Sequence, residues 1–259
     1  MKYLPIDSNL FVKNRAKLAE RMMPGSLAIF NANDVLPSNA DGTMAFRQNN
    51  ELFYFSGVDQ EESILVLFPD STVEKHREIL FLRETNEEIA IWEGEKLTKE
   101  TAYDTSGVKT VYWVQDFHKI LRSIIYEAET IYLNDNEHLR ADTTVETRDD
   151  RFRDWCKKEY PLHNYGRIAP IVHNLRAVKE PEEIELMQNA CNITAKGVNR
   201  VLQFIKPGVM EYEIEAELMH EFLRNRSKGF AYSPIIASGF NACVLHYIEN
   251  NQVCKAGDV

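Results

Sequence analysis

Short apolar runs alternate with helical patterns over the first ~170 residues, and this alternation limits the fold more than any other feature of the sequence. The segments 9–23 and 115–128 have helical spacing, and Pro24-Gly25 stops the first of them. Strands alternating with helices predict a layered α/β structure. The runs with the composition of strands are 26–30, 52–55, 64–68, 78–82, 89–92, 111–114 and 130–133.

The pattern changes near residue 175, where two longer helices are predicted. Pro181 suits the first position of a helix, and the two glutamates after it complement the positive end of the helix dipole. Apolar residues then keep helical spacing from Ile184 to Ile205, and a second helix is predicted over 211–226. Strand-like stretches follow at 234–237 and 242–247. We therefore predict two domains, residues 1–172 and 173–259.

The segment Lys255–Val259 has the composition of a turn that opens a strand. A domain rarely ends at the first residue of an apolar strand, because the backbone groups and core contacts of that strand are then missing. We expect from this feature that the chain is truncated.

Composition narrows the function classes. Of 259 residues, 44% are apolar and 27% are charged, which is typical of a soluble globular protein. The formal net charge of −10 would repel polyanions, so neither nucleic acid nor an anionic membrane is an expected partner. No signal peptide or membrane span is recognisable. The four cysteines form no Cys-x-x-Cys pair, which favours reduced thiols and a cytoplasmic protein.

Common catalytic and metal motifs are incomplete in this sequence. His220-Glu221 would begin a zincin helix, but Arg224 stands where the second histidine is required. Ser238-Gly239 lacks the flanking glycines of a nucleophile elbow. No set of His, Asp, Glu or Cys residues predicts a metal site. The charge run over 147–158 is interpreted as the solvated face of a helix.

His246 is the residue with two competing interpretations. It lies in the apolar stretch 242–247, where a histidine alone is more often a satisfied core residue than a functional one. The segments around it decide how it is interpreted.

Three segments together resemble the aminopeptidase P family of Xaa-Pro aminopeptidases. The stretch 46–57, followed by the strand 64–68, resembles the signature of that family's N-terminal domain. The stretch 170–184 is similar to the family's linker and first catalytic-domain helix. The stretch 232–247 resembles the segment around the active-site histidine. Their order and spacing make the resemblance specific over nearly the whole chain.

The resemblance implies a fold, an activity and cofactors. It implies a creatinase/aminopeptidase P-like α/β N-terminal domain, followed by an incomplete pita-bread (α+β) catalytic domain. The family releases the N-terminal residue from proline-containing Xaa-Pro peptides and uses two divalent metals, usually manganese (Mn²⁺). All five family ligands would fall beyond Val259, so none of the metal ligands is expected in this chain. We expect the chain alone to be inactive and to bind no metal.

The resemblance also implies site residues and partners. His246 would donate a hydrogen bond to the substrate near the scissile carbonyl, and Tyr232 would lie in the shell around the metal site. A homo-oligomer, either a dimer or a tetramer, is implied as well. Two alternatives stay open: a prolidase or creatinase-type relative with another substrate, and a peptidase-like binding or oligomerisation module without catalysis.

Overall fold

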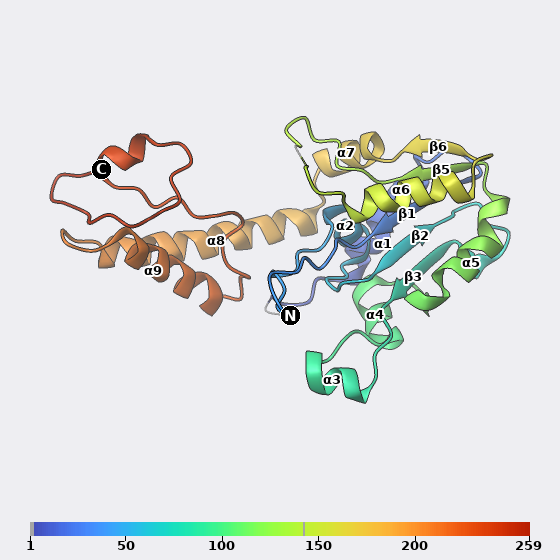
Figure 1. Cartoon of the computed structure of the whole chain (residues 1–259), viewed down its shortest axis with the longest axis horizontal. Helices are drawn as coiled ribbons and strands as arrows, with labels where there is room; N and C mark the ends of the chain where they lie inside the picture. The colour runs from blue at the N-terminus through green and yellow to red at the C-terminus, as the bar shows by residue number, and fades with distance from the viewer. Residues whose placement is uncertain (1–2, 142) are drawn as a thin grey trace. The chain divides into compact units, whose positions relative to one another are not determined.

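The computed structural model describes residues 3–141 and 143–259, which form two compact units (Figure 1). One unit comprises Ile6–Lys179, and the other is built on Glu180–Val259. The sequence placed the division at residue 172, which lies inside helix α7 (Ala169–Ala177). Val172 and Leu175 of this helix are buried in the core of the first unit, so the units divide later in the chain.

The first unit is built on a mixed sheet with the strand order β4-β3-β2-β1-β5-β6. Strand β1 (Ser26–Asn31) pairs antiparallel with β2 (Ile64–Leu67) and parallel with β5 (Thr130–Leu133). This sheet confirms the predicted α/β fold of the first part of the chain. The outer strands are β3 (Glu78–Leu82), β4 (Thr110–Trp113) and β6 (Asn164–Arg167).

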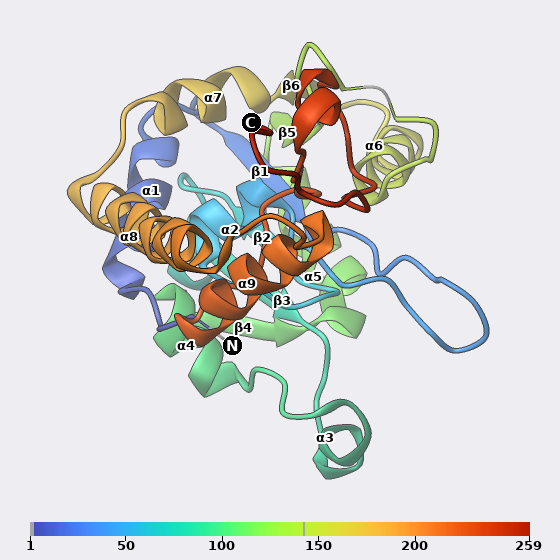
Figure 2. The same cartoon turned by 90° about the vertical axis from the view of Figure 1, so that its left-hand side faces the viewer.

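Helices cover both faces of the sheet, which gives three layers (Figure 2). Successive residues of a strand point to opposite faces, so Phe30 of β1 belongs to one apolar core and Ile29 to the other. Because both faces are buried, the central strands carry unbroken apolar runs, 27–30 in β1 and 64–67 in β2. The first core receives side chains from α1 (Ser8–Ala19), α2 (Asn50–Ser56), α4 (Lys99–Ser106) and α7, and the second from α5 (Phe117–Ile124) and α6 (Arg148–Glu159).

Arg15 of α1 joins the ends of two helices inside the first unit. Its side chain is 1% exposed, and its Nη1 donates to the carbonyl oxygens of Phe55 and Ser106, at 2.8 Å each. These carbonyls lie at the carboxyl ends of α2 and α4, where a cation is favourable. Both helices then end at a glycine in the left-handed conformation. At one of these, Gly57, a Cβ atom would lie 2.2 Å from the ring of Phe11.

Two segments that the sequence predicted as strands are helices. The run 52–55 belongs to α2, because the side chain of Asn49 accepts hydrogen bonds from the backbone N–H groups of Glu51 and Leu52 at 3.0 and 3.2 Å. The run 89–92 belongs to α3 (Glu87–Glu93), which begins in the same way at Asn86. In both cases a capping residue outweighs the strand preference of aromatic and β-branched side chains.

The second unit contains the two long helices that the sequence predicted, α8 (Pro181–Phe204) and α9 (Glu211–Arg224). They pack together at Gly197, where a Cβ atom would lie 2.9 Å from Phe222. The strands predicted at 234–237 and 242–247 are absent from this described part of the chain, which has irregular backbone and a 3-10 helix (Gly239–Cys243) instead. A strand needs a neighbour for its backbone hydrogen bonds. The described residues of this unit supply only an isolated bridge between Met210 and Val253.

All four cysteines are free, with Cys156 and Cys254 buried and Cys191 and Cys243 exposed. Burial raises the pKa of the Cys156 thiol to about 12, which makes it a poor nucleophile. In the part of the chain that the structure describes, every helix is too short or too polar to cross a membrane.

Candidate functional site

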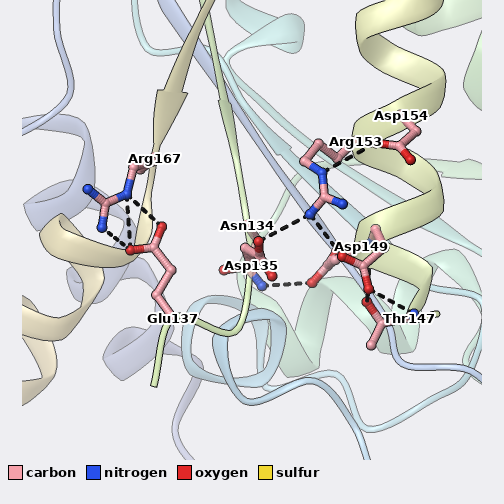
Figure 3. Close-up of polar contacts among 9 residues, drawn as sticks. Asn134, Asp135, Glu137, Thr147, Asp149, Arg153, Asp154 and Arg167 are labelled. Atoms are coloured by element: carbon pink, nitrogen blue, oxygen red, sulfur yellow. Dashed lines mark hydrogen bonds and ion pairs between the residues drawn. The ribbon is translucent and has the colours of Figure 1, made fainter. Parts of the chain in front are cut away.

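Polar side chains gather where the parallel strands β1 and β5 end (Figure 3). Asn31 is the last residue of β1, and Asn134 directly follows β5. The carboxyl ends of parallel strands meet at the same edge of a sheet, which is where ligands bind in many open α/β folds. A pocket of about 240 Å³ lies there, and its lining includes Asn134, Asp149 of α6 and His173 of α7.

Asp149 is the half-buried carboxylate at the centre of this polar pocket. Its Oδ1 accepts a hydrogen bond from Nδ2 of Asn31 at 2.9 Å, and its Oδ2 accepts from Nδ2 of Asn134 at 3.0 Å and of Asn49 at 3.4 Å. Burial raises the pKa of Asp149 to about 6, while the hydrogen bonds from the asparagines oppose the rise. The side chain therefore changes protonation state near pH 6.

Asp149 differs from the carboxylates around it in having no cationic partner. Among the described residues, no lysine or arginine nitrogen lies within ion-pair distance of Asp149. The carboxylate of Asp149 is therefore bound by neutral amides, whereas the other carboxylates at this edge are bound by arginines, as Figure 3 shows in part. The neighbouring pairs are Arg153 with Asp135 and Asp150, Arg167 with Glu137, and Arg176 with Glu51.

The sequence does not predict this pocket, because the charge run 147–158 has the composition of a solvated helix face. That interpretation fits the exposed part of α6, but Asp149 faces the sheet edge. The local signal was the spacing Thr147-x-x-Asp150, a capping box. Oδ2 of Asp150 accepts from the backbone N–H of Thr147 at 2.9 Å, and Oγ1 of Thr147 accepts from the backbone N–H of Asp150 at 3.2 Å. This box sets the start of α6 and hence the direction of Asp149.

In the second unit, the buried carboxylate of Glu211 organises the irregular chain. Its Oε1 accepts from the backbone N–H of Ser238 at 2.7 Å and from the hydroxyl of Ser238 at 3.1 Å. Its Oε2 accepts from the hydroxyl of Tyr247 at 2.6 Å and from the backbone N–H of Gln252 at 3.0 Å. Burial favours the neutral acid, but these donors together lower the pKa of Glu211. One carboxylate thus connects α9 to three points of the chain.

The two site residues predicted from the sequence, Tyr232 and His246, both lie in this irregular part of the second unit. Tyr232 is 77% exposed. His246 is exposed in a turn rather than on the predicted strand, and it directly precedes Tyr247, whose hydroxyl bonds to Glu211. The structure therefore places His246 beside an anchored residue, while the roles of His246 and Tyr232 stay predictions.

The side chains of the described residues do not form a metal centre. Within residues 3–141 and 143–259, no group of three or more His, Cys, Asp or Glu side chains could hold a metal ion. The carboxylates at the polar pocket form ion pairs with arginines or hydrogen bonds with amides instead. The residues present therefore do not fit a two-metal site, and no reaction step follows from them through a metal.

Two family models match the chain, one after the other along the sequence. Residues 11–132 match the aminopeptidase P N-terminal domain, and residues 185–259 match metallopeptidase family M24. The first match includes strands β1 to β4 and most of β5, and the second includes Glu211, Tyr232 and His246.

Curated relatives extend the likeness over almost the whole chain. The Xaa-Pro aminopeptidase of Escherichia coli is 31% identical over 255 residues, which are 98% of this chain and 58% of the relative. That of Haemophilus influenzae is 31% identical over 252 residues, which are 96% of this chain and 55% of the relative. The chain therefore spans somewhat more than half the length of these relatives.

Solved structures show the same likeness in the fold. Aminopeptidase PepP of Pseudomonas aeruginosa has a TM-score of 0.86 and 28% identity, covering 99% of this chain and 58% of that one. Aminopeptidase P of E. coli in its low pH form has a TM-score of 0.82 and 30% identity, covering 98% of this chain and 58% of that one. The chain therefore consists of an aminopeptidase P N-terminal domain followed by part of a metallopeptidase family M24 domain, and it is similar over almost its whole length to Xaa-Pro aminopeptidases.

Proposed function

We propose that this chain forms the N-terminal domain and the first part of the catalytic domain of a metal-dependent Xaa-Pro aminopeptidase. The observation that carries the proposal is the similarity to a protein named Xaa-Pro aminopeptidase over 98% of the chain. Because the chain spans 58% of that relative, the activity belongs to a longer protein that includes it. The substrate is a peptide with proline in second position.

The chemistry of the substrate accounts for the need for a specialised site. The bond before proline is a tertiary amide without an N–H group, so a peptidase that binds this donor cannot process it. Bound divalent metals supply a nucleophile and stabilise the oxyanion in metallopeptidases, and manganese is the metal proposed here. The described residues contain no group of side chains that could hold a metal ion, so we assign the ligands to other residues of the longer protein.

Within this chain, the proposal gives His246 and Tyr232 roles at the substrate. The imidazole of His246 is proposed to donate a hydrogen bond to the carbonyl oxygen as negative charge develops there. Tyr232 is proposed to lie in the shell around the metal site. Glu211 supports this arrangement, because it anchors Tyr247, the residue that follows His246.

The test compares the longer protein, expressed from the full gene, with the 259-residue chain. Both are incubated with a tripeptide that has proline second and with a matched tripeptide that has alanine second, in the presence of Mn²⁺. We expect the longer protein to release the first residue from the proline peptide only, and the chain alone to release nothing and to bind no stoichiometric manganese in calorimetry.

Each other outcome has a defined meaning for the proposal. Cleavage by the longer protein of Xaa-Pro dipeptides but not of tripeptides would replace the proposal with a prolidase. No cleavage of either peptide with manganese bound would favour a creatinase-type relative, and no cleavage without metal binding would favour a non-catalytic module. Tight manganese binding by the chain alone would overturn the assignment of the ligands.

A further inference from the structure

A second pocket of the first unit, unconnected with the proposed peptidase function, lies at the amino ends of β5 and β6. Its volume is about 490 Å³. Its lining comes from the 3-10 helix η3 (Ile125–Glu127) and the residues after it, the end of α6, and the segment between α6 and β6. Because β5 and β6 are parallel, this pocket lies at the opposite end of these strands from Asp149.

Aromatic rings form one wall of this pocket. Tyr126, Tyr160 and His163 contact one another, with ring centroids 5.9 to 6.1 Å apart. Tyr160 is buried, and His163 is fixed by a 2.9 Å hydrogen bond between its Nε2 and the carbonyl oxygen of Ile125. Tyr126 is 66% exposed. An exposed ring is therefore backed by two rings whose positions the fold holds.

Two carboxylates line the same pocket and are free to meet a ligand. The side chains of Glu129 and Glu159 are exposed, and neither makes an ion pair or a side-chain hydrogen bond among the described residues. Burial and the charge of Glu159 both raise the pKa of Tyr160, with Arg122 partly offsetting them. The negative charge of Glu159 therefore acts on the aromatic wall itself.

We propose that this pocket binds an arginine side chain of a peptide or protein partner. A guanidinium is attracted to the face of an aromatic ring, and its planar fork matches a carboxylate. The apolar stem of an arginine would pack on the surface of Leu162, which is 97% exposed. The combination of tyrosines with unpaired carboxylates selects a cation, because a neutral apolar ligand would gain no electrostatic attraction from Glu129 and Glu159.

Nuclear magnetic resonance of the 259-residue chain tests this proposal with a matched pair of peptides. One is acetyl-Gly-Arg-Gly-amide, and the other has citrulline, which keeps the shape of arginine without its charge. We expect the arginine peptide to shift the amide signals of 126–129 and 159–164 with a Kd on the order of 1 mM. The citrulline peptide should bind at least about fivefold more weakly than the arginine peptide.

Variants localise the effect. Tyr126→Ala should weaken the arginine peptide about fivefold, and Glu159→Gln about two- to threefold. Tyr103→Ala removes a tyrosine of α4 that is 47% exposed and lies outside the pocket, so it should leave the Kd unchanged. Equal binding of the two peptides, absence of shifts at these residues, or the same loss in Tyr103→Ala would overturn the proposal.

Discussion

Replacing Glu211 by glutamine tests whether one buried carboxylate holds the irregular chain of the second unit. Glu211 has no exposed surface, and its two oxygens accept four hydrogen bonds from Ser238, Tyr247 and Gln252. Glutamine has nearly the same shape, but it carries no charge and has an NH₂ group in place of one oxygen. If the NH₂ group takes the place of Oε2, it faces the backbone N–H of Gln252, which is then left without an acceptor.

The expected loss of stability follows from these contacts. A buried donor without a partner costs about 1–3 kcal/mol, and each bond to a charged acceptor weakens by roughly 1 kcal/mol when the acceptor becomes neutral. We expect a local loss of about 3 kcal/mol. Apolar burial adds little stability to this unit, since only Val209, Ile214 and Cys254 form its buried core cluster among the described residues.

Acid should have the same effect as the substitution. The pKa of Glu211 is lowered by folding, so its stabilising contribution is present at pH values above its ordinary pKa. This contribution is lost as the pH falls through the lowered pKa of the folded chain. Glu211→Gln should remove this part of the acid dependence.

Hydrogen exchange of backbone amides measures the effect where it arises. A local loss of about 3 kcal/mol corresponds to roughly 10²-fold faster exchange at the amides of Ser238 and Gln252. Glu217→Gln is the matched control on the same helix, because Glu217 pairs with the half-exposed Arg200 and should contribute no more than about 1 kcal/mol. Unchanged protection at both amides, or equal losses in the two variants, would refute the reasoning.

Three further predictions concern other residues. Folding raises the pKa of Asp149 from 3.8 to about 6, so protonation should stabilise the folded chain. As the pH falls from above 6 to below 4, the free energy of unfolding of the wild-type chain, measured in urea, should rise by up to about 3 kcal/mol relative to that of Asp149→Asn. Arg15→Met should cost about 3–5 kcal/mol in the same assay, since it leaves buried carbonyls without a donor, whereas a change at the exposed Arg21 should cost less than about 0.5 kcal/mol. In the longer protein, His246→Ala should lower kcat about 10²-fold with bound manganese unchanged; a normal kcat with a lowered Tm would make His246 a core residue.

Local pattern was enough to locate most of the regular structure. The runs at 26–30, 64–68, 78–82, 111–114 and 130–133 all became strands, within a residue or two of the predicted limits. The inner strands were readable because both faces of the sheet are buried there, which favours unbroken apolar runs. The long helices α8 and α9 were readable because Pro181, Pro207 and a sustained helical spacing mark their limits.

The same reasoning failed where a neighbour decides the conformation. The run 52–55 has the composition of a strand, but Asn49 starts a helix there and Arg15 donates a hydrogen bond to the carbonyl oxygen of Phe55 near its end. The stretch 242–247 also has the composition of a strand, but it finds no partner among the described residues and stays irregular. Composition states what a segment prefers, whereas its hydrogen-bond partners decide what it forms.

The sequence by itself determined the α/β layers, the two long helices and the family resemblance, because these depend on residues that are close together in the chain. The tertiary structure alone decided the surroundings of Asp149, since Asn31 and Asn134 come together only through the parallel pairing of β1 with β5. The same holds for Glu211, whose donors are brought to it from up to 41 residues away. A buried carboxylate needs its donors in place, and only the folded chain can place them.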